Sequence, residues 1–189
     1  MRTVIHVSDL HFGSILLPTL EPLLEIMWSL KPDLVIVSGD LTQRAKVEQF
    51  REAAAFIARM PSPRIVVPGN HDIPLYDVLR RFTAPLERYK EFITTEPTYR
   101  PSISTMNWPP SASTRRAHSH QASAEIFQPG YYATILQAGT ATSTRARGEP
   151  NSFFVFRIDG GRIDVDTFSW MTVANAFGLT NSRTLPARH

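Results

Sequence analysis

The sequence predicts an α/β fold in which three parallel strands alternate with two amphipathic helices. Short runs rich in β-branched residues stand at 3–8, 34–38 and 64–68, at about the spacing of a βαβ unit. Between them, apolar residues recur at helical spacing over 20–30 and again over 47–57. Strands and helices that alternate in this way form a parallel sheet, and right-handed crossovers place the carboxyl ends of the strands along one edge.

Each of the two helical stretches carries one apolar stripe. The stripe positions are Leu20, Leu23, Leu24, Met27 and Leu30 in the first stretch and Val47, Phe50, Ala54 and Ile57 in the second. Residues three and four positions apart share a helix face, so we expect both helices to bury this stripe against the sheet.

The chain changes character after residue 100. Residues 101–124 are rich in Pro, Ser, Thr and Arg and show no sustained period, which predicts an irregular loop. Residues 125–175 contain further strands, among them a β-hairpin whose strands cover 152–158 and 162–170 and flank an Asp-Gly-Gly turn.

We expect one domain over residues 1–175, with a βαβαβ half over 1–100. The segment 176–189 is polar and shows no core pattern, so it predicts a frayed tail. The N-terminal apolar run meets Asp9 before it reaches the length of a signal-peptide core. No apolar run reaches the roughly 18 residues of a membrane span. We therefore expect a cytoplasmic protein that does not enter a membrane.

Composition narrows the chemistry that the chain can perform. Hydrophobic residues make up 42% and charged residues 20% of the 189 positions, which is typical of a folded globular domain. Because cysteine is absent, a metal must be bound by oxygen and imidazole, and a disulfide framework is excluded. The net charge of +3 produces only a weak field, which argues against nucleic acid as a partner.

Polar residues of the same chemical kind follow each predicted parallel strand. Asp9 and His11 follow the first strand, Asp40 follows the second, and Asn70 and His71 follow the third. We expect these side chains to line one crevice at the carboxyl edge of the sheet. Carboxylate, imidazole and amide oxygen bind Mn, Fe, Co or Zn. Each group alone also fits an ordinary turn or helix cap, and it is their convergence that predicts a metal site.

Three segments resemble a known family in order and spacing. SDLHFG, SGDLTQRA and VPGNHDIPLY resemble the motifs of the calcineurin-like metallophosphoesterases, in particular those of the bacterial cyclic-nucleotide-phosphodiesterase-like branch. A fourth segment, QAGTATSTRARGEPNSFFVFRI, looks like the C-terminal part of that branch. The resemblance implies a β-sandwich core flanked by helices in α-β-β-α layers, with two metal ions at the sheet edge. It also implies that Asp9 and His11 bind the first ion, Asp40 bridges both, and Asn70 binds the second.

The resemblance further implies hydrolysis of a phosphate ester. Two divalent ions can hold a bridging hydroxide and neutralise the phosphoryl oxygens. Asp40 suits the bridging position, because an ionised carboxylate offers two oxygens and a negative charge between the cations. His71 directly follows Asn70, so we expect it to face the substrate and to donate a proton or a hydrogen bond, as a catalytic residue. The alternative role is a histidine that orients a ligand.

The sequence departs from the family pattern in its second half, which is shortened. The family draws further histidines from a His-His-Pro strand end and from a Gly-His-x-His motif. No His-His-Pro stands between Asp72 and His118, so we expect an internal deletion. The one His-x-His pair is His118 and His120, which are therefore candidate metal ligands. The alternative is a pair of solvated histidines beside Arg115 and Arg116.

The predicted function is metal-dependent hydrolysis of a small phosphodiester, with cyclic nucleotides among the candidate substrates. Two other functions stay open. One is a truncated, inactive relative with an incomplete metal site. The other is a basic nucleic-acid-binding module, which would use Arg115, Arg116, Arg145 and Arg147.

Overall fold

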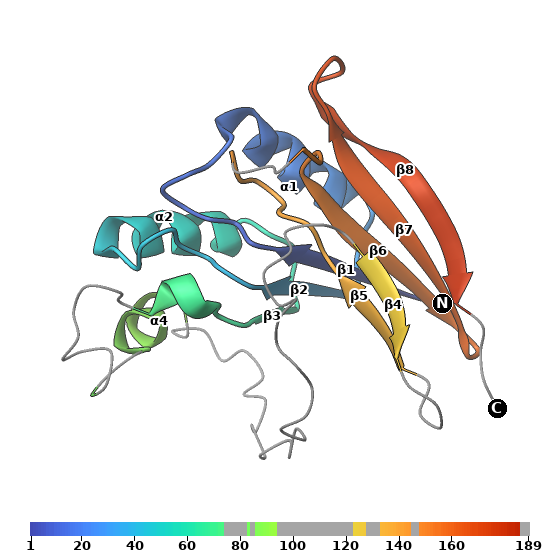
Figure 1. The fold of residues 1–189 in the computed structure, drawn as a ribbon, viewed down its shortest axis with the longest axis horizontal. Coiled ribbons are helices and arrows are strands. Elements are labelled where there is room, and N and C mark those ends of the chain that lie inside the picture. Colours follow the sequence, from blue (N-terminus) through green and yellow to red (C-terminus); the bar gives the residue numbers. More distant parts are fainter. Residues whose placement is uncertain (74–82, 84–85, 94–122, 128–132, 145–147, 186–189) are drawn as a thin grey trace.

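A six-stranded mixed sheet forms the centre of the fold in a computed structural model of the chain (Figure 1). The structure describes residues 1–73, 83, 86–93, 123–127, 133–144 and 148–185. The sheet has the order β3-β2-β1-β6-β7-β8. Its strands are β1 (Arg2–Ser8), β2 (Leu34–Ser38), β3 (Arg64–Val66), β6 (Ser152–Asp159), β7 (Arg162–Met171) and β8 (Ala176–Leu185). The first three are mutually parallel, and β6, β7 and β8 continue the sheet in antiparallel pairing.

Three helices, two short 3-10 turns and a second, two-stranded sheet complete the described elements. They are η1 (Leu17–Thr19), α1 (Leu20–Ser29), α2 (Val47–Ala58), η2 (Asn70–Asp72), α4 (Glu87–Phe92), β4 (Ser123–Phe127) and β5 (Ala133–Gln137). A mixed α/β fold with a helix-flanked sheet is therefore confirmed. Among the described residues, none of the helices has the length and apolar character needed to cross a bilayer.

The hydrophobic core lies between one face of the sheet and helices α1 and α2. Ile5 and Val7 of β1 are fully buried on that face, while the intervening side chain of His6 points to the other face, as strand geometry requires. The buried helix residues are Leu23, Leu24 and Met27 of α1 and Phe50, Ala53, Phe56 and Ile57 of α2. Of the predicted stripe positions, Leu23, Leu24, Met27, Phe50 and Ile57 are confirmed as buried. Leu20, Leu30 and Val47 are only partly buried, and Ala53 rather than Ala54 is the buried alanine of α2.

The predicted hairpin is confirmed as β6 and β7, which pair in continuous register from Ser152↔Ser169 to Asp159↔Arg162. Phe153 of β6 faces the same core as the helices and stacks on Phe168 of β7, with ring centroids 5.3 Å apart. Aromatic pairs in this arrangement contribute about 0.5–1.5 kcal/mol beyond their buried area. The hairpin therefore extends the core across the antiparallel half of the sheet.

The prediction of a frayed tail over 176–189 was wrong for the described part of that segment. Residues Ala176–Leu185 form β8, which pairs with β7 and is the last strand of the sheet. Phe177 is buried against Trp170 and Phe153. Only this large apolar residue reaches the helix-side core from β8, so the strand shows no alternating pattern in the sequence. Pairing with β7, rather than burial of its side chains, explains why this segment is an ordered strand.

The predicted loop over 101–124 lies mostly outside the described residues. Its last two positions belong to β4, which begins at Ser123 and pairs antiparallel with β5. The loop prediction was therefore wrong at Ser123 and Ala124.

Candidate metal centre

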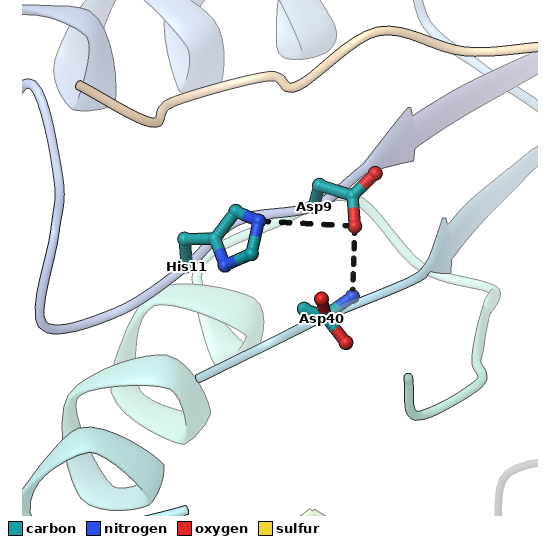
Figure 2. Close-up of side chains that lie close together, drawn as sticks. All are labelled: Asp9, His11 and Asp40. Carbon is teal, nitrogen blue, oxygen red and sulfur yellow. Dashed lines mark hydrogen bonds and ion pairs between the residues drawn. The ribbon is translucent and has the colours of Figure 1, made fainter. Parts of the chain in front are cut away.

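The carboxyl ends of β1 and β2 bring three predicted ligands into one cluster. Asp9 and His11 follow β1, and Asp40 follows β2, which pairs with β1 up to Ser8↔Ser38. One potential ligand atom from each of the three residues lies within 4.8 Å of the other two. Figure 2 shows the three side chains converging between the two loops. His11 is 1% exposed and Asp40 is 6% exposed, so two of the three groups are removed from bulk water.

An unusual backbone conformation orients the first two candidate ligands. Asp9 and His11 have φ angles of 55° and 53°, in the left-handed region that non-glycine residues seldom occupy. Hydrogen bonds to the end of β2 and to the loop after it hold them there: Asp9 N–H donates to Ser38 O and His11 N–H donates to Asp40 O, each at 3.0 Å. The Asp9 carboxylate also accepts the Asp40 N–H at 3.0 Å. The two ligand loops are therefore bonded to each other directly at the site.

Two glycines make this close approach possible. Gly39 has a φ of +75°, and a Cβ there would stand 2.6 Å from the Asp9 carboxylate. A Cβ on Gly69 would stand 2.2 Å from an Asp40 carboxylate oxygen. Both contacts are far shorter than van der Waals distance, so only glycine lets the loops after β2 and β3 pack against the ligands.

His71 lies beside Asp40, as expected for residues that follow neighbouring parallel strands. Its backbone N–H donates to Asp40 Oδ1 at 2.9 Å, and its ring Nε2 lies 3.9 Å from Asp40 Oδ2. Ring Nδ1 lies 3.0 Å from the carbonyl oxygen of Gln43. Because a carbonyl only accepts, Nδ1 carries a hydrogen, and Nε2 is the nitrogen presented to the site. The His71 ring meets that of His11 edge to face, with centroids 5.9 Å apart.

Asp72 joins the loop after β2 to the loop after β3. Its buried carboxylate accepts four hydrogen bonds, from Leu41 N–H, Thr42 N–H, Thr42 Oγ1 and Gly69 N–H, at 2.7 to 3.0 Å. Burial raises the pKa of Asp72 to about 6, while the four donors favour the charged form. The four hydrogen bonds tie the two loops together and so fix the position of Asp40 relative to His71.

Replacing Asp72 with Ala is expected to lower the free energy of unfolding by about 3 kcal/mol, because it leaves several buried donors without an acceptor. The loss is smaller than the sum of four bonds, since removing the carboxylate also removes the cost of burying its charge. Urea denaturation of the metal-free chain measures it. Asp33→Ala is the matched control, because Asp33 also accepts a backbone N–H but is exposed. An equal loss in both variants would contradict the role of Asp72.

The cluster fits a divalent cation. Two carboxylates and an imidazole lie close together, and among the described residues the ion-pair partners of Asp9 and Asp40 are histidines only. Carboxylates held near each other away from water need a positive partner. Oxygen and imidazole nitrogen are suitable ligands for Mn, Fe, Co or Zn. The donor set, its spacing and its burial therefore match one metal ion.

The other predicted site residues are only partly described. Asn70 is exposed in η2, next to His71 at the same edge of the sheet. His118 and His120, and the arginines of the nucleic-acid alternative, lie outside the described residues. Asn70, His118 and His120 as ligands stay predictions.

Sequence reasoning missed two residues that organise the site. Asp72 was not singled out as a site residue, because an aspartate at this position also fits an ordinary helix cap. Thr142 was not singled out, although its segment lies against the loop of Asp9 and His11. The one sequence signal for Thr142 was the resemblance of its segment to the C-terminal part of the family.

Comparisons with known proteins identify the family and the fold. The family model of the calcineurin-like phosphoesterases matches residues 2–130. Two similar solved structures are Vps29 from Chaetomium thermophilum, with a TM-score of 0.57 and 12% identity, and a single mutant of Vps29 from Entamoeba histolytica, with a TM-score of 0.56 and 13% identity. The first match covers 99% of this chain and 98% of the other, and the second covers 97% and 99%. At this identity the two structures show a shared fold. No curated protein sequence matches the chain.

Proposed function

Because the chain belongs to the calcineurin-like phosphoesterase family, we propose that it hydrolyses phosphodiester bonds with the help of divalent metal ions held at the carboxyl edge of the sheet. The cluster of Asp9, His11 and Asp40, with ligand atoms within 4.8 Å of one another, is the observation that carries this proposal. The family motifs and the cluster coincide: each of the three ligands lies in a segment that resembles a family motif.

The proposed ligands divide between two ions. Asp9 and His11 would hold the first ion, Asp40 would contribute to both, and Asn70 would contribute to the second, with His118 and His120 as further candidates. When bound, divalent ions supply positive charge for the phosphoryl oxygens and lower the pKa of water to about 7. Mn, Fe, Co and Zn are the candidate metals.

The protein's own contribution to the reaction is proposed to centre on His71. The bond from Nδ1 to Gln43 O holds the ring with Nε2 towards Asp40. From there Nε2 can donate a hydrogen bond or a proton to the oxygen that leaves the phosphorus. Since Nδ1 already carries a hydrogen, proton donation from Nε2 uses the doubly protonated ring.

The substrate is proposed to be a small phosphodiester, with cyclic nucleotides as one candidate class, in a cytoplasmic protein. Membership of the bacterial cyclic-nucleotide branch and the internal deletion belong to the same proposal. A second candidate is an inactive relative that binds one ion. One observation favours this inactive relative. Among the described acidic and histidine residues, the group that could hold a metal has three members, which is few for two ions.

Metal removal tests the proposed function. We expect the purified chain to hydrolyse bis(4-nitrophenyl) phosphate with Mn²⁺, to lose this activity on treatment with EDTA, and to regain it when Mn²⁺ is restored. Elemental analysis of the same sample counts the bound ions. Asp159→Asn is the control variant, because it removes one exposed carboxylate at the opposite end of β6 from the site. Bound metal without turnover would support the inactive relative, and turnover that resists EDTA would contradict the proposal.

A further inference from the structure

A segment far along the chain packs against the loop that carries Asp9 and His11, on the side away from the loop after β2. We define residues 8–16, from the end of β1 onwards, as the ligand loop, and residues 140–144 as the clamp segment. The two pair through a parallel bridge, Ser8↔Thr140, and an antiparallel bridge, Ile15↔Ser143. Three backbone hydrogen bonds join the two: Ala141 N–H to Ser8 O at 2.9 Å, Leu16 N–H to Thr142 O at 2.7 Å, and Thr144 N–H to Ser14 O at 2.9 Å. The ligand loop is therefore enclosed between the loop after β2 and the clamp segment.

One side chain of the clamp segment bonds the ligand loop between the two ligands. Thr142 is fully buried, and its Oγ1 donates to the carbonyl oxygen of Leu10 at 2.8 Å. The Leu10 carbonyl and the His11 N–H belong to one planar peptide unit. The His11 N–H donates to Asp40 O on the other side, at 3.0 Å. This peptide is thus held from both sides and cannot rotate without breaking a buried hydrogen bond.

We propose that Thr142 is a positioning residue of the metal centre, whose hydroxyl holds the Leu10–His11 peptide so that Asp9 and His11 point towards Asp40. The proposal rests on the proposed function, because it assumes that the cluster binds metal. The left-handed backbone at Asp9 and His11, with φ of 55° and 53°, is intrinsically unfavourable. The buried hydrogen bond from Thr142 Oγ1 to Leu10 O offsets this unfavourable conformation, on the side of the peptide opposite Asp40.

The neighbouring threonine provides a matched comparison. Thr140 is also buried in the clamp segment, but its Oγ1 donates to Asn151 Oδ1 at 2.9 Å rather than to the ligand loop. Thr140→Val and Thr142→Val therefore remove the same group from the same buried segment. Only the second change removes a bond to the peptide between the ligands.

Isothermal titration of the metal-free chain with Mn²⁺ tests the proposal without relying on turnover. We expect Thr142→Val to bind Mn²⁺ about 10- to 100-fold more weakly than the wild type, the range found for groups that orient metal ligands. Thr142→Ser keeps the hydroxyl and is expected to retain the wild-type affinity. Thr140→Val is expected to lower the melting temperature while leaving the affinity unchanged. If Thr142→Val does not fold, Thr142→Cys, which is close in size and only a weak donor, takes its place.

The outcomes separate the inference from the proposed function. A wild-type chain that binds no Mn²⁺ refutes both. Wild-type binding together with unchanged affinity in Thr142→Val refutes the positioning role alone. Equal losses of affinity in Thr140→Val and Thr142→Val would also overturn it, since they would indicate a general loosening of the clamp segment.

Discussion

Asp40→Asn is expected to abolish Mn²⁺-dependent phosphodiester hydrolysis. Asp40 connects the cluster to His71: it is one of the three grouped candidate ligands, it accepts the His71 N–H, and its carboxylate faces the His71 ring. An amide retains one acceptor oxygen and loses the negative charge, so it cannot serve two cations. Because groups that only orient a ligand already cost 10–100-fold in metal affinity, we expect the loss of this ligand to exceed about a hundredfold. Titration with Mn²⁺ and the chromogenic diester assay measure the two effects.

The stability of the same variant distinguishes a metal ligand from a structural carboxylate. In the metal-free wild type, Asp9 and Asp40 place two negative charges close together, so the change to Asn relieves repulsion. We expect metal-free Asp40→Asn to melt at the same temperature as the wild type or higher. Saturating Mn²⁺ should raise the melting temperature of the wild type, because a ligand that binds only the folded state stabilises it, and should leave that of the variant unchanged. A variant that still gains stability from Mn²⁺ would contradict the assignment of Asp40.

The parts of the fold that could be predicted from the sequence are those with a regular apolar pattern. The first half, from β1 to β3, has strands buried on the helix side and helices with one stripe each, and both leave a period in the sequence. The cluster of Asp9, His11 and Asp40 followed from the same pattern, because parallel strands end at one edge. The β6–β7 hairpin was predicted from its alternation and its Asp-Gly-Gly turn.

The parts that could not be predicted depend on contacts without a periodic signature. Strand β8 lies at the edge of the sheet and contributes Phe177 alone to the main core, so its sequence resembles that of a polar tail. Asp72 stabilises the site through backbone N–H groups, which every residue type but proline provides. Thr142 bonds a backbone carbonyl 132 positions away. The backbone contacts of both residues place no requirement on the residue type of the partner, so the sequence alone gives no sign of them.

His71→Ala is expected to lower kcat by about 10²- to 10⁴-fold, the usual contribution of general acid–base catalysis, while the Mn²⁺ affinity stays unchanged. The metal site should survive because His71 bonds Asp40 Oδ1 through its backbone N–H, which alanine retains. Single-turnover and steady-state assays, with Mn²⁺ titration on the same protein, measure both quantities. His6→Gln is a suitable control, because His6 is a partly buried histidine of β1 that bonds Ser38 Oγ at 2.7 Å and lies outside the ligand cluster.

The leaving group separates proton donation by His71 from a purely orienting role. Expulsion of 4-nitrophenolate needs little help from an acid, whereas expulsion of an alkoxide depends on a proton supplied in the transition state. If Nε2 of His71 supplies that proton, the loss in His71→Ala will be at least tenfold larger for an alkyl phosphodiester than for bis(4-nitrophenyl) phosphate, which is a difference of about 1.4 kcal/mol in the barrier. Equal losses for the two esters would indicate that the ring only orients neighbouring groups, and full turnover of both would exclude His71 from the reaction.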